Sequence, residues 1–365
     1  MATEQNGLNC RERVLRAINF QYPDKIPLAY SVIPPELFKY GQRFVDLCRK
    51  YPNDFYDSNE VIKIPKRDEE NYRPDGSYYK EWTDEWESVW VYLKEGISGE
   101  VKYPVLDDWS KLKTFKVPPV PNSSPADRKR LKEGMKKQKE KYVGWGGGGS
   151  FFEQMQWLRG TENLFMDIAS DCEEVYELAD MLLEKRILPS IEITIEAGAD
   201  VVGFGDDWGT QQQLLINPKS WRKIFKPRYK KMFDRVRQGG ALPWMHSDGM
   251  TMEIIPDWIE IGLKVFNPQL SCMDMREIQK LCAGKLCIAG DIDRQWALPF
   301  GTPEQVREYI RAVTKVFGSS KGGFIYQFCL EDTPIENAEA AFQTVYDIRD
   351  LSSGSNRPSS KGKGR

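Results

Sequence analysis

The sequence between residues 201 and 249 reads VVGFGDDWG at 201–209 and LPWMHSDG at 242–249, and a helix-forming stretch at 218–237 lies between them. Each run begins with apolar residues, as a buried strand does, and ends in charged residues and glycine. A strand, a helix and a second strand at this spacing indicate two parallel strands joined by a crossover helix. This part of the chain therefore predicts an α/β fold.

The same alternation continues on both sides of this stretch, with further helices expected at 172–197, 250–261, 273–282 and 303–317. The sequence predicts eight short strands, at 26–30, 54–57, 142–145, 201–205, 242–246, 264–267, 286–290 and 323–328. Eight such units favour a closed (β/α)₈ TIM barrel over an open sheet. An open sheet would need a nucleotide-binding turn, and the glycine run at 146–150 has neither GxGxxG spacing nor a GK[ST] ending. We expect one barrel domain over 1–351.

Residues 60–141 form an insertion in this pattern. Trp82, Trp86 and Trp90 are spaced as on one face of a helix, but the turn signal at 74–76 favours a β-hairpin. At 122–141 we expect a helix with eight Lys/Arg against three Asp/Glu, which is either a solvated surface or a docking surface for an acidic partner. The tail at 352–365 has no large apolar residue and is expected to be disordered, as a native tail or as a tag or linker.

Composition excludes several functional classes. The 52 Lys+Arg and 54 Asp+Glu give a net charge of -2, so no basic field points to nucleic acid. No apolar run is long enough for a membrane span and no secretion signal is visible, so we expect a cytoplasmic protein. Seven scattered cysteines without a CxxC pair favour reduced thiols. His246 is the sole histidine, which excludes every metal site or mechanism that needs two.

Barrel enzymes carry their chemistry at the C-terminal ends of the strands. His246 ends the fifth predicted strand two residues before Asp248, so the imidazole and the carboxylate should point to one side. Cys329 ends the eighth predicted strand. We expect His246, Asp248 and Cys329 to form a zinc site with an open fourth position. The alternatives are a histidine satisfied by a backbone carbonyl and a cysteine buried as a small apolar residue.

Asp206 and Asp207 follow the fourth predicted strand. Burial beside Trp208 would raise a carboxyl pKa, so one of the two is expected to act as an acid or base; a helix cap and a surface charge are the alternative. The candidate catalytic residues are therefore His246, Asp206 and Asp207. The candidate substrate-binding residues are Phe151, Glu153, Trp208, Gln211, Gln269, Asp291 and Tyr326. The alternatives are that Phe151 and Trp208 belong to the core and that Asp291 is a solvated carboxylate in a turn.

Four segments, at 201–209, 244–249, 266–268 and 288–293, resemble the uroporphyrinogen decarboxylase superfamily. The resemblance extends over about 15–345 and implies a single (β/α)₈ barrel. The superfamily holds true decarboxylases and cobalamin-linked methyltransferases. The decarboxylases carry an N-terminal Arg-Gln-Ala-Gly-Arg signature that neutralises substrate carboxylates, whereas residues 31–35 read SVIPP.

The methyltransferase branch is the more similar one. Its members bind zinc through H-x-C and a distant Cys near the last strand. His246 matches the first ligand and Cys329 the last, while Asp248 stands where the middle Cys would be. A carboxylate makes the metal a harder Lewis acid, which suits polarising an ether oxygen. The chain has no Asp-x-His-x-x-Gly motif, so a corrinoid would be carried by a separate protein.

The resemblance implies methyl-group transfer, in a corrinoid-dependent demethylase or methyltransferase component that acts on a small methoxylated or methylated compound. A metal-independent decarboxylase or lyase of a small aromatic acid is the first alternative. A non-catalytic barrel that binds a small ligand is the second. The expected partners are a small-molecule substrate and a corrinoid protein, with a homodimer as the candidate assembly and no nucleic acid or membrane.

Overall fold

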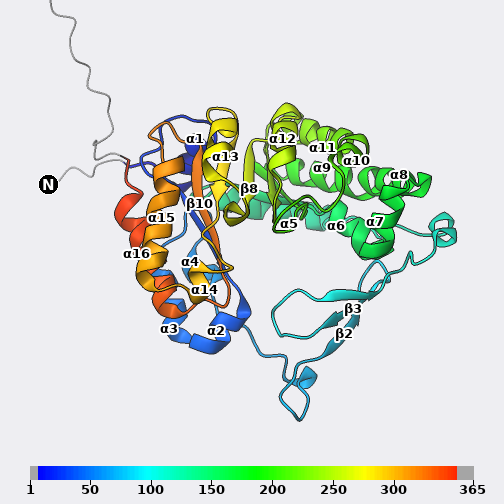
Figure 1. The fold of residues 1–365 in the computed structure, drawn as a ribbon, viewed down its shortest axis with the longest axis horizontal. Helices are drawn as coiled ribbons and strands as arrows, with labels where there is room; N and C mark the ends of the chain where they lie inside the picture. Colours follow the sequence, from blue (N-terminus) through cyan, green and yellow to red (C-terminus); the bar gives the residue numbers. More distant parts are fainter. Residues whose placement is uncertain (1–6, 352–365) are drawn as a thin grey trace, which may run out of the picture.

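A curled parallel sheet of seven strands forms the centre of the computed structural model, which describes residues 7–351 (Figure 1). The strands are β1 (Leu28–Val32), β5 (Trp145–Gly149), β6 (Val201–Gly205), β7 (Leu242–Ser247), β8 (Val265–Pro268), β9 (Cys287–Gly290) and β10 (Phe324–Leu330). Their order across the sheet is β1-β10-β9-β8-β7-β6-β5, and every pair is parallel. The tail at 352–365, which we expect to be disordered, lies outside the described residues.

Helices follow most strands and cover the outer face of the sheet, with α9 against β5 and α11 against β7. The α-helices are α1 (Cys10–Ile18), α2 (Pro34–Tyr40), α3 (Gln42–Lys50), α4 (Ser58–Val61), α5 (Pro125–Gln138), α6 (Phe152–Arg159), α7 (Thr161–Ala169), α8 (Glu173–Leu182), α9 (Leu188–Glu196), α10 (Pro218–Ile224), α11 (Lys226–Gln238), α12 (Ile255–Glu260), α13 (Met275–Cys282), α14 (Ala297–Phe300), α15 (Pro303–Phe317) and α16 (Ile335–Ile348). Short 3₁₀ turns are η1 (Glu69–Asn71), η2 (Trp109–Lys113), η4 (Met252–Ile254) and η5 (Leu270–Cys272), and η3 (Leu183–Ile187) is a π-helix. In the part of the chain from 7 to 351, no helix has both the length and the apolar character needed to cross a membrane.

Local sequence explains where these helices begin and bend. Thr302 and Gln305 form a capping box at the start of α15, and its buried residues recur at helical spacing from Val306 to Phe317. The π-helix η3 joins α8 to α9 directly before Pro189. Because proline has no N–H to donate to the preceding turn, the helix widens there.

The strand predicted at 54–57 is wrong, and the sheet has seven strands in the described residues rather than eight. Asp54 makes a single backbone bond to β1, from its N to the carbonyl of Leu28 (2.9 Å), and its carboxylate accepts from Leu28 N at 2.8 Å. Phe55 instead turns inward and packs edge-on against Trp145 and Trp244. This segment closes the space between β1 and β5 with side chains instead of a ladder.

The inner face of the sheet is filled at its N-terminal end and open at its C-terminal end. A buried apolar floor contains Val14, Ile18, Phe55, Val201, Trp244, Val265, Cys287, Ala289 and Ile325. Two or four residues beyond the floor, the inward positions along the strands become polar or lack a side chain, because successive side chains alternate between faces. They include Ser31, Gly205, His246, Asn267 and Cys329. We call this open end the mouth.

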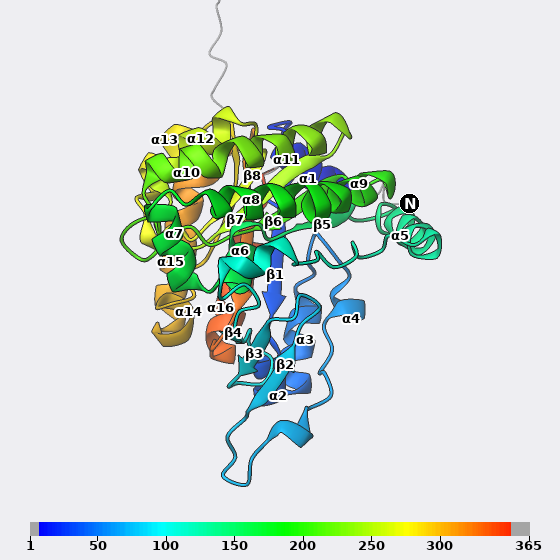
Figure 2. The same cartoon turned by 90° about the vertical axis from the view of Figure 1, so that its right-hand side faces the viewer.

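The β-hairpin predicted in the insertion is confirmed as β structure. It forms a three-stranded antiparallel sheet of β2 (Lys80–Thr83), β3 (Val89–Tyr92) and β4 (Glu100–Tyr103). Figure 2 places this sheet beyond the C-terminal end of β1, on the side of the mouth. The charged helix is confirmed as α5, which buries Met135. A docking role for its basic surface stays a prediction.

The two ends of the described chain meet behind the floor. Arg13 donates to Asp24 at 2.7 Å and to Asp54 at 2.8 Å. Arg349, at the end of α16, also donates to Asp54. The N–H of Leu351 donates to the carbonyl of Asp24 at 2.9 Å. Both ends are therefore fixed beside the start of β1.

Candidate metal site at the barrel mouth

His246 lies near the end of β7 on the inner face of the sheet, where its ring is held by the neighbouring strand. Its Nδ1 is 2.8 Å from Oδ1 of Asn267, its register partner on β8. The Nδ2 of Asn267 donates to the carbonyl oxygen of Ala289 at 2.6 Å. A carbonyl only accepts, so the Asn267 amide has to present its oxygen to His246. Nδ1 therefore carries the proton, and in the neutral ring Nε2 has a free lone pair.

Two carboxylates face that lone pair. Nε2 of His246 is 3.4 Å from Oδ1 of Asp248 and 3.7 Å from Oδ1 of Asp207. One ligand atom from each of the three residues lies within 4.8 Å of the others. The expected approach of His246 and Asp248 to one side is thus observed, and Asp207 joins them from the loop after β6.

Close packing of two loops holds these carboxylates in place. The N–H of Asp248 donates to Asp207 Oδ1 at 2.8 Å, and the N–H of Gly209 donates to the carbonyl of Asp248 at 3.1 Å. A Cβ added to Gly249 would lie 2.1 Å from the Gly209 oxygen, and Gly249 has a φ of +77°. Only glycine lets the β6 and β7 loops approach this closely.

The chemistry of the three side chains fits a divalent cation. One neutral imidazole and two carboxylates are donors that zinc and other first-row divalent metals accept. Burial and the charge of Asp248 raise the pKa of Asp207, so the cluster has negative charge that a cation would relieve. Arg294 neutralises part of this negative charge by donating a hydrogen bond to Asp248. Asp207, His246 and Asp248 are therefore the residues that would hold a metal.

Cys329 lies near this group without belonging to it. It lines a cavity of about 260 Å³ together with His246, Asp291, Arg294 and Gln327. Burial raises the pKa of its thiol, which disfavours the thiolate that binds a metal. Within residues 7–351 the clustered ligand atoms come from Asp207, His246 and Asp248, and zinc binding by Cys329 stays a prediction.

Two further acidic groups at the mouth have a raised pKa. Burial raises the pKa of Asp291 to about 8, although Nε of Arg294 is 3.4 Å from its carboxylate. Burial and the charges of Asp206 and Asp207 raise the pKa of Glu153 to about 8. For Asp291 the cost of burying the charge outweighs the attraction of Arg294, whereas for Glu153 burial and the neighbouring negative charges act in the same direction.

Asp206 lies on the other side of the chain from Asp207. Its carboxylate accepts from the N–H groups of Phe151 (2.9 Å) and Glu153 (2.9 Å) and from the Tyr229 hydroxyl (2.5 Å). It is 1% exposed, and burial raises its pKa to about 7. This placement corrects the expectation that Asp206 faces the mouth as an acid or base. Asp206 instead ties the loop after β5 to α11.

Three of the expected substrate contacts are also corrected by their placement. Trp208 and Phe151 are fully buried in an aromatic cluster behind the sheet, where the Trp208 ring stacks on Phe152 at 3.9 Å. Tyr326 is buried on the outer face of β10 and bonds to Thr314 of α15. All three belong to the core between the sheet and the helices.

The other expected substrate contacts lie at the rim of the mouth. Gln269 is 3% exposed and accepts from the N–H of Gly249 at 2.9 Å. Gln211 is exposed, and its Oε1 lies 3.2 Å from the Cys272 thiol. Glu153 and Asp291 are the two acidic groups at the mouth whose pKa is raised. Substrate binding by these four residues stays a prediction.

Sequence reasoning assigned no role to Asn267, Arg294 or Gln327. Asn267 was visible as a polar residue at the end of a strand, but its pairing with His246 depends on the register of the sheet. Arg294 follows Asp291 by three residues in a loop whose path no periodicity predicts. Gln327 lies two residues before Cys329, so strand alternation places both on the inner face.

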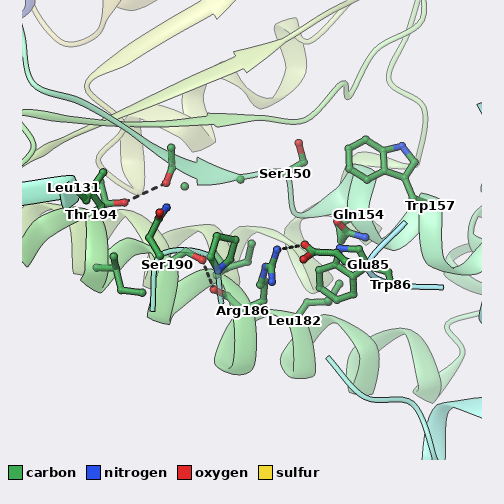
Figure 3. A pocket seen from close by; sticks show the side chains of 17 residues that line it. Glu85, Trp86, Leu131, Ser150, Gln154, Trp157, Leu182, Arg186, Ser190 and Thr194 are labelled. Atoms are coloured by element: carbon green, nitrogen blue, oxygen red, sulfur yellow. Dashed lines mark hydrogen bonds and ion pairs between the residues drawn. The ribbon is translucent and has the colours of Figure 1, made fainter. Parts of the chain in front are cut away.

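A second cavity, of about 370 Å³, lies beside the free edge of β5 (Figure 3). Its wall includes the backbone of Gly147 to Gly149, and Gln154 and Trp157 of α6 face it. Glu85 and Trp86 of the insertion cover it, and Arg186 of the π-helix η3 pairs with Glu85. The Nε2 of Gln154 is buried and has no hydrogen-bond partner.

Comparisons with known proteins agree with this architecture. A methyltransferase from Methanosarcina mazei is similar in structure, with a TM-score of 0.63, 15% identity, and coverage of 93% of this chain and 99% of that one. A B12-independent methionine synthase from Shewanella sp. W3-18-1 has a TM-score of 0.36, 11% identity and coverage of 74% of both chains. At 15% identity, the likeness to the Methanosarcina mazei methyltransferase shows the fold alone. No curated protein sequence matches.

The sequence pattern of the family described as Uroporphyrinogen decarboxylase (URO-D) matches residues 91–348. This range begins at β3 of the insertion and contains six of the seven strands of the central sheet. It also contains Asp207, His246 and Asp248. The chain belongs to the uroporphyrinogen decarboxylase family of enzymes.

Proposed function

We propose that this protein transfers methyl groups as a component of a corrinoid-dependent demethylase or methyltransferase system. The observation that carries the proposal is the group of Asp207, His246 and Asp248 at the mouth, with the lone pair of His246 Nε2 directed at the two carboxylates. Zinc held there would act as a Lewis acid on the oxygen that the methyl group leaves. The methyl donor is a small methoxylated or methylated compound, and the acceptor is a corrinoid on a partner protein.

The residues around the site would manage charge and protons. When the carbon–oxygen bond breaks, the methyl group passes to the corrinoid partner and the oxygen left behind gains a negative charge that a proton has to neutralise. Glu153 holds a proton at neutral pH and lies near enough to Asp207 for that charge to raise its pKa. Its carboxyl group is our candidate proton donor. Arg294, which lies between Asp248 and Asp291, would hold these two carboxylates in position.

The test uses zinc-loaded protein, free cob(I)alamin as the acceptor and 2-methoxyphenol as the donor, with methylthio and methylamino compounds as further donors. Formation of methylcobalamin is followed by its absorption spectrum. We expect turnover by the wild type, loss of at least about 100-fold in His246→Gln, and unchanged turnover in Asp293→Asn, which changes a neighbouring carboxylate outside the metal group.

Three outcomes would contradict the proposal. The first is the absence of bound metal after reconstitution, as measured by elemental analysis. The second is equal turnover in the wild type and in His246→Gln. The third is release of CO₂ from aromatic acids by the metal-free protein, which would favour the decarboxylase alternative. Binding of these compounds without any turnover would favour a ligand-binding barrel.

A further inference from the structure

Strands β5 and β6 contain six glycines, and the structure explains four of them. A Cβ on Gly146 would lie 2.1 Å from Thr194, one on Gly148 would lie 2.0 Å from Phe204, and one on Gly203 would lie 2.4 Å from Trp145. Gly149 has a φ of +85°, which favours glycine. Contacts within the protein or backbone conformation require glycine at each of these positions.

Gly147 and Gly205 have no such explanation. A Cβ on either residue would have no atom within 4 Å, and neither has a positive φ. Glycine inside a strand reduces stability because it adds backbone freedom and packs no side chain. A glycine that nothing in the protein requires often marks a place where a ligand approaches the backbone closely.

Both glycines face the inside of the barrel. Trp145 packs against Trp244 and Phe55 in the floor, and its ring covers Gly203. Gly147 and Gly205 lie two residues beyond Trp145 and Gly203, so strand alternation places them on the same inner face, one step nearer the mouth. The two residues leave an open space above the floor.

This space lies next to the metal site. Gly205 is the register partner of His246, and paired strands are about 4.8 Å apart. On its other side Gly147 borders the cavity of about 370 Å³ in which Gln154 Nε2 lacks a partner (Figure 3). Gly147 and Gly205 thus lie on adjacent strands between His246 and the cavity that holds the unused hydrogen-bond donor of Gln154.

We infer that Gly147 and Gly205 form the wall of a substrate slot, against which a flat ring lies with its reacting group at His246. Two glycines present a level backbone surface, and a planar ring can make close contact along it. The free N–H of Gln154 can donate a hydrogen bond to an oxygen atom of the ligand, on the side of the ring away from His246. The ligand class is therefore a single-ring aromatic compound with an oxygen substituent. Its identification as a methyl donor rests on the proposed function.

The test compares Gly147→Ala, Gly205→Ala and Gly205→Val with the wild type. Binding of 2-methoxyphenol and of catechol to zinc-loaded protein is measured by calorimetry and by ligand-observed NMR. We expect each added methyl to weaken ring binding by about 10- to 100-fold, because one methyl group in a fitted pocket changes affinity by that order. Zinc affinity should stay unchanged. Tm should stay constant or rise by about 1–3 °C, because alanine fits the free space and reduces backbone freedom.

Gly134→Ala is the matched control. A Cβ at Gly134 also has no neighbour within 4 Å, and this glycine is exposed on helix α5 and lines neither of the two cavities. It should bind the ring compounds as the wild type does. Unchanged ring affinity in both Gly147→Ala and Gly205→Ala would overturn the inference, and so would a wild type that binds neither ring compound. Loss of ring binding in the glycine variants, together with an absence of methyl transfer by the wild type, would support the slot and contradict the proposed function instead.

Discussion

Asn267 accepts from His246 across the β7–β8 pair, with 2.8 Å between Oδ1 and Nδ1, and its own amide nitrogen is used by Ala289. This relationship decides which ring nitrogen is available at the mouth. A metal-binding histidine commonly has such a partner on its second nitrogen. Here the partner comes from the neighbouring strand, so the register of the sheet sets the chemistry of the site.

The first prediction tests this relationship. Asn267→Leu should release the ring, give a mixture of the two neutral tautomers, and weaken zinc binding by about 10- to 100-fold. The ¹⁵N spectrum of the imidazole reports the tautomer, and it needs no assignment because His246 is the sole histidine. Gln327→Leu is the control, since Gln327 lines the same cavity and has no bond to His246. An unchanged Nδ1–H tautomer in Asn267→Leu would contradict the argument.

The second prediction separates the adjacent aspartates. Asp206→Ala leaves two N–H groups and the Tyr229 hydroxyl without their acceptor, so it should reduce the free energy of unfolding by about 2–4 kcal/mol. Asp207→Ala should change the free energy of unfolding by less than about 1 kcal/mol and should weaken zinc binding by more than about 100-fold. Urea unfolding and zinc titration measure the two effects. A reversed pattern would mean that Asp206 is the residue at the mouth.

The third prediction concerns pH. The pKa of Glu153 is about 8 in the folded chain and about 4.5 ordinarily, so between these values the folded state keeps a proton that the unfolded state has lost. The stability of the metal-free protein should therefore fall as pH rises from about 5 to about 8 and level off above that. Glu153→Gln cannot ionise and should remove this part of the loss. Its Tm should exceed that of the wild type by an amount that grows with pH.

Glu162→Gln is the control for that experiment, because Glu162 is exposed on α7. Its Tm should follow the wild type at every pH. A difference between Glu153→Gln and the wild type that is constant over this range would show that ionisation of Glu153 has no part in the stability.

The fourth prediction concerns the contact between the two mouth loops. Gly249→Ala should cost about 2–4 kcal/mol, since it combines a positive φ with a Cβ 2.1 Å from the Gly209 oxygen. Gly198→Ala has a φ of +90° but free space, and it should cost about 1–2 kcal/mol. Only Gly249→Ala should also weaken zinc binding, because it displaces Asp248. Equal effects of the two variants on zinc would contradict the role of the loop contact.

Sequence periodicity predicted the fold well because buried parallel strands and amphipathic helices have distinct patterns. It failed at 54–57. There the Asp54 carboxylate accepts the hydrogen bond of the Leu28 N–H, and no ladder of backbone hydrogen bonds to β1 forms. A run of four residues is too short for periodicity to separate a strand from an irregular segment that packs one aromatic ring.

The strand-end rule found His246, Asp248 and Asp207, but it could not select between neighbouring residues. A shift of one residue at the end of β6 decides whether Asp206 or Asp207 faces the mouth, and that shift depends on the bonds to Phe151 and Glu153. One error was avoidable. Tyr326 and Cys329 are an odd number of residues apart, so strand alternation already excludes that both face inward.

The meeting of the chain ends behind the floor has a practical consequence. Gly7 and Leu351 both lie beside Asp24, before the start of β1 and therefore at the end of the barrel away from His246. A tether attached beyond either residue would leave from that rear face. The protein can thus be anchored to a solid support through either end with its mouth turned toward the solution.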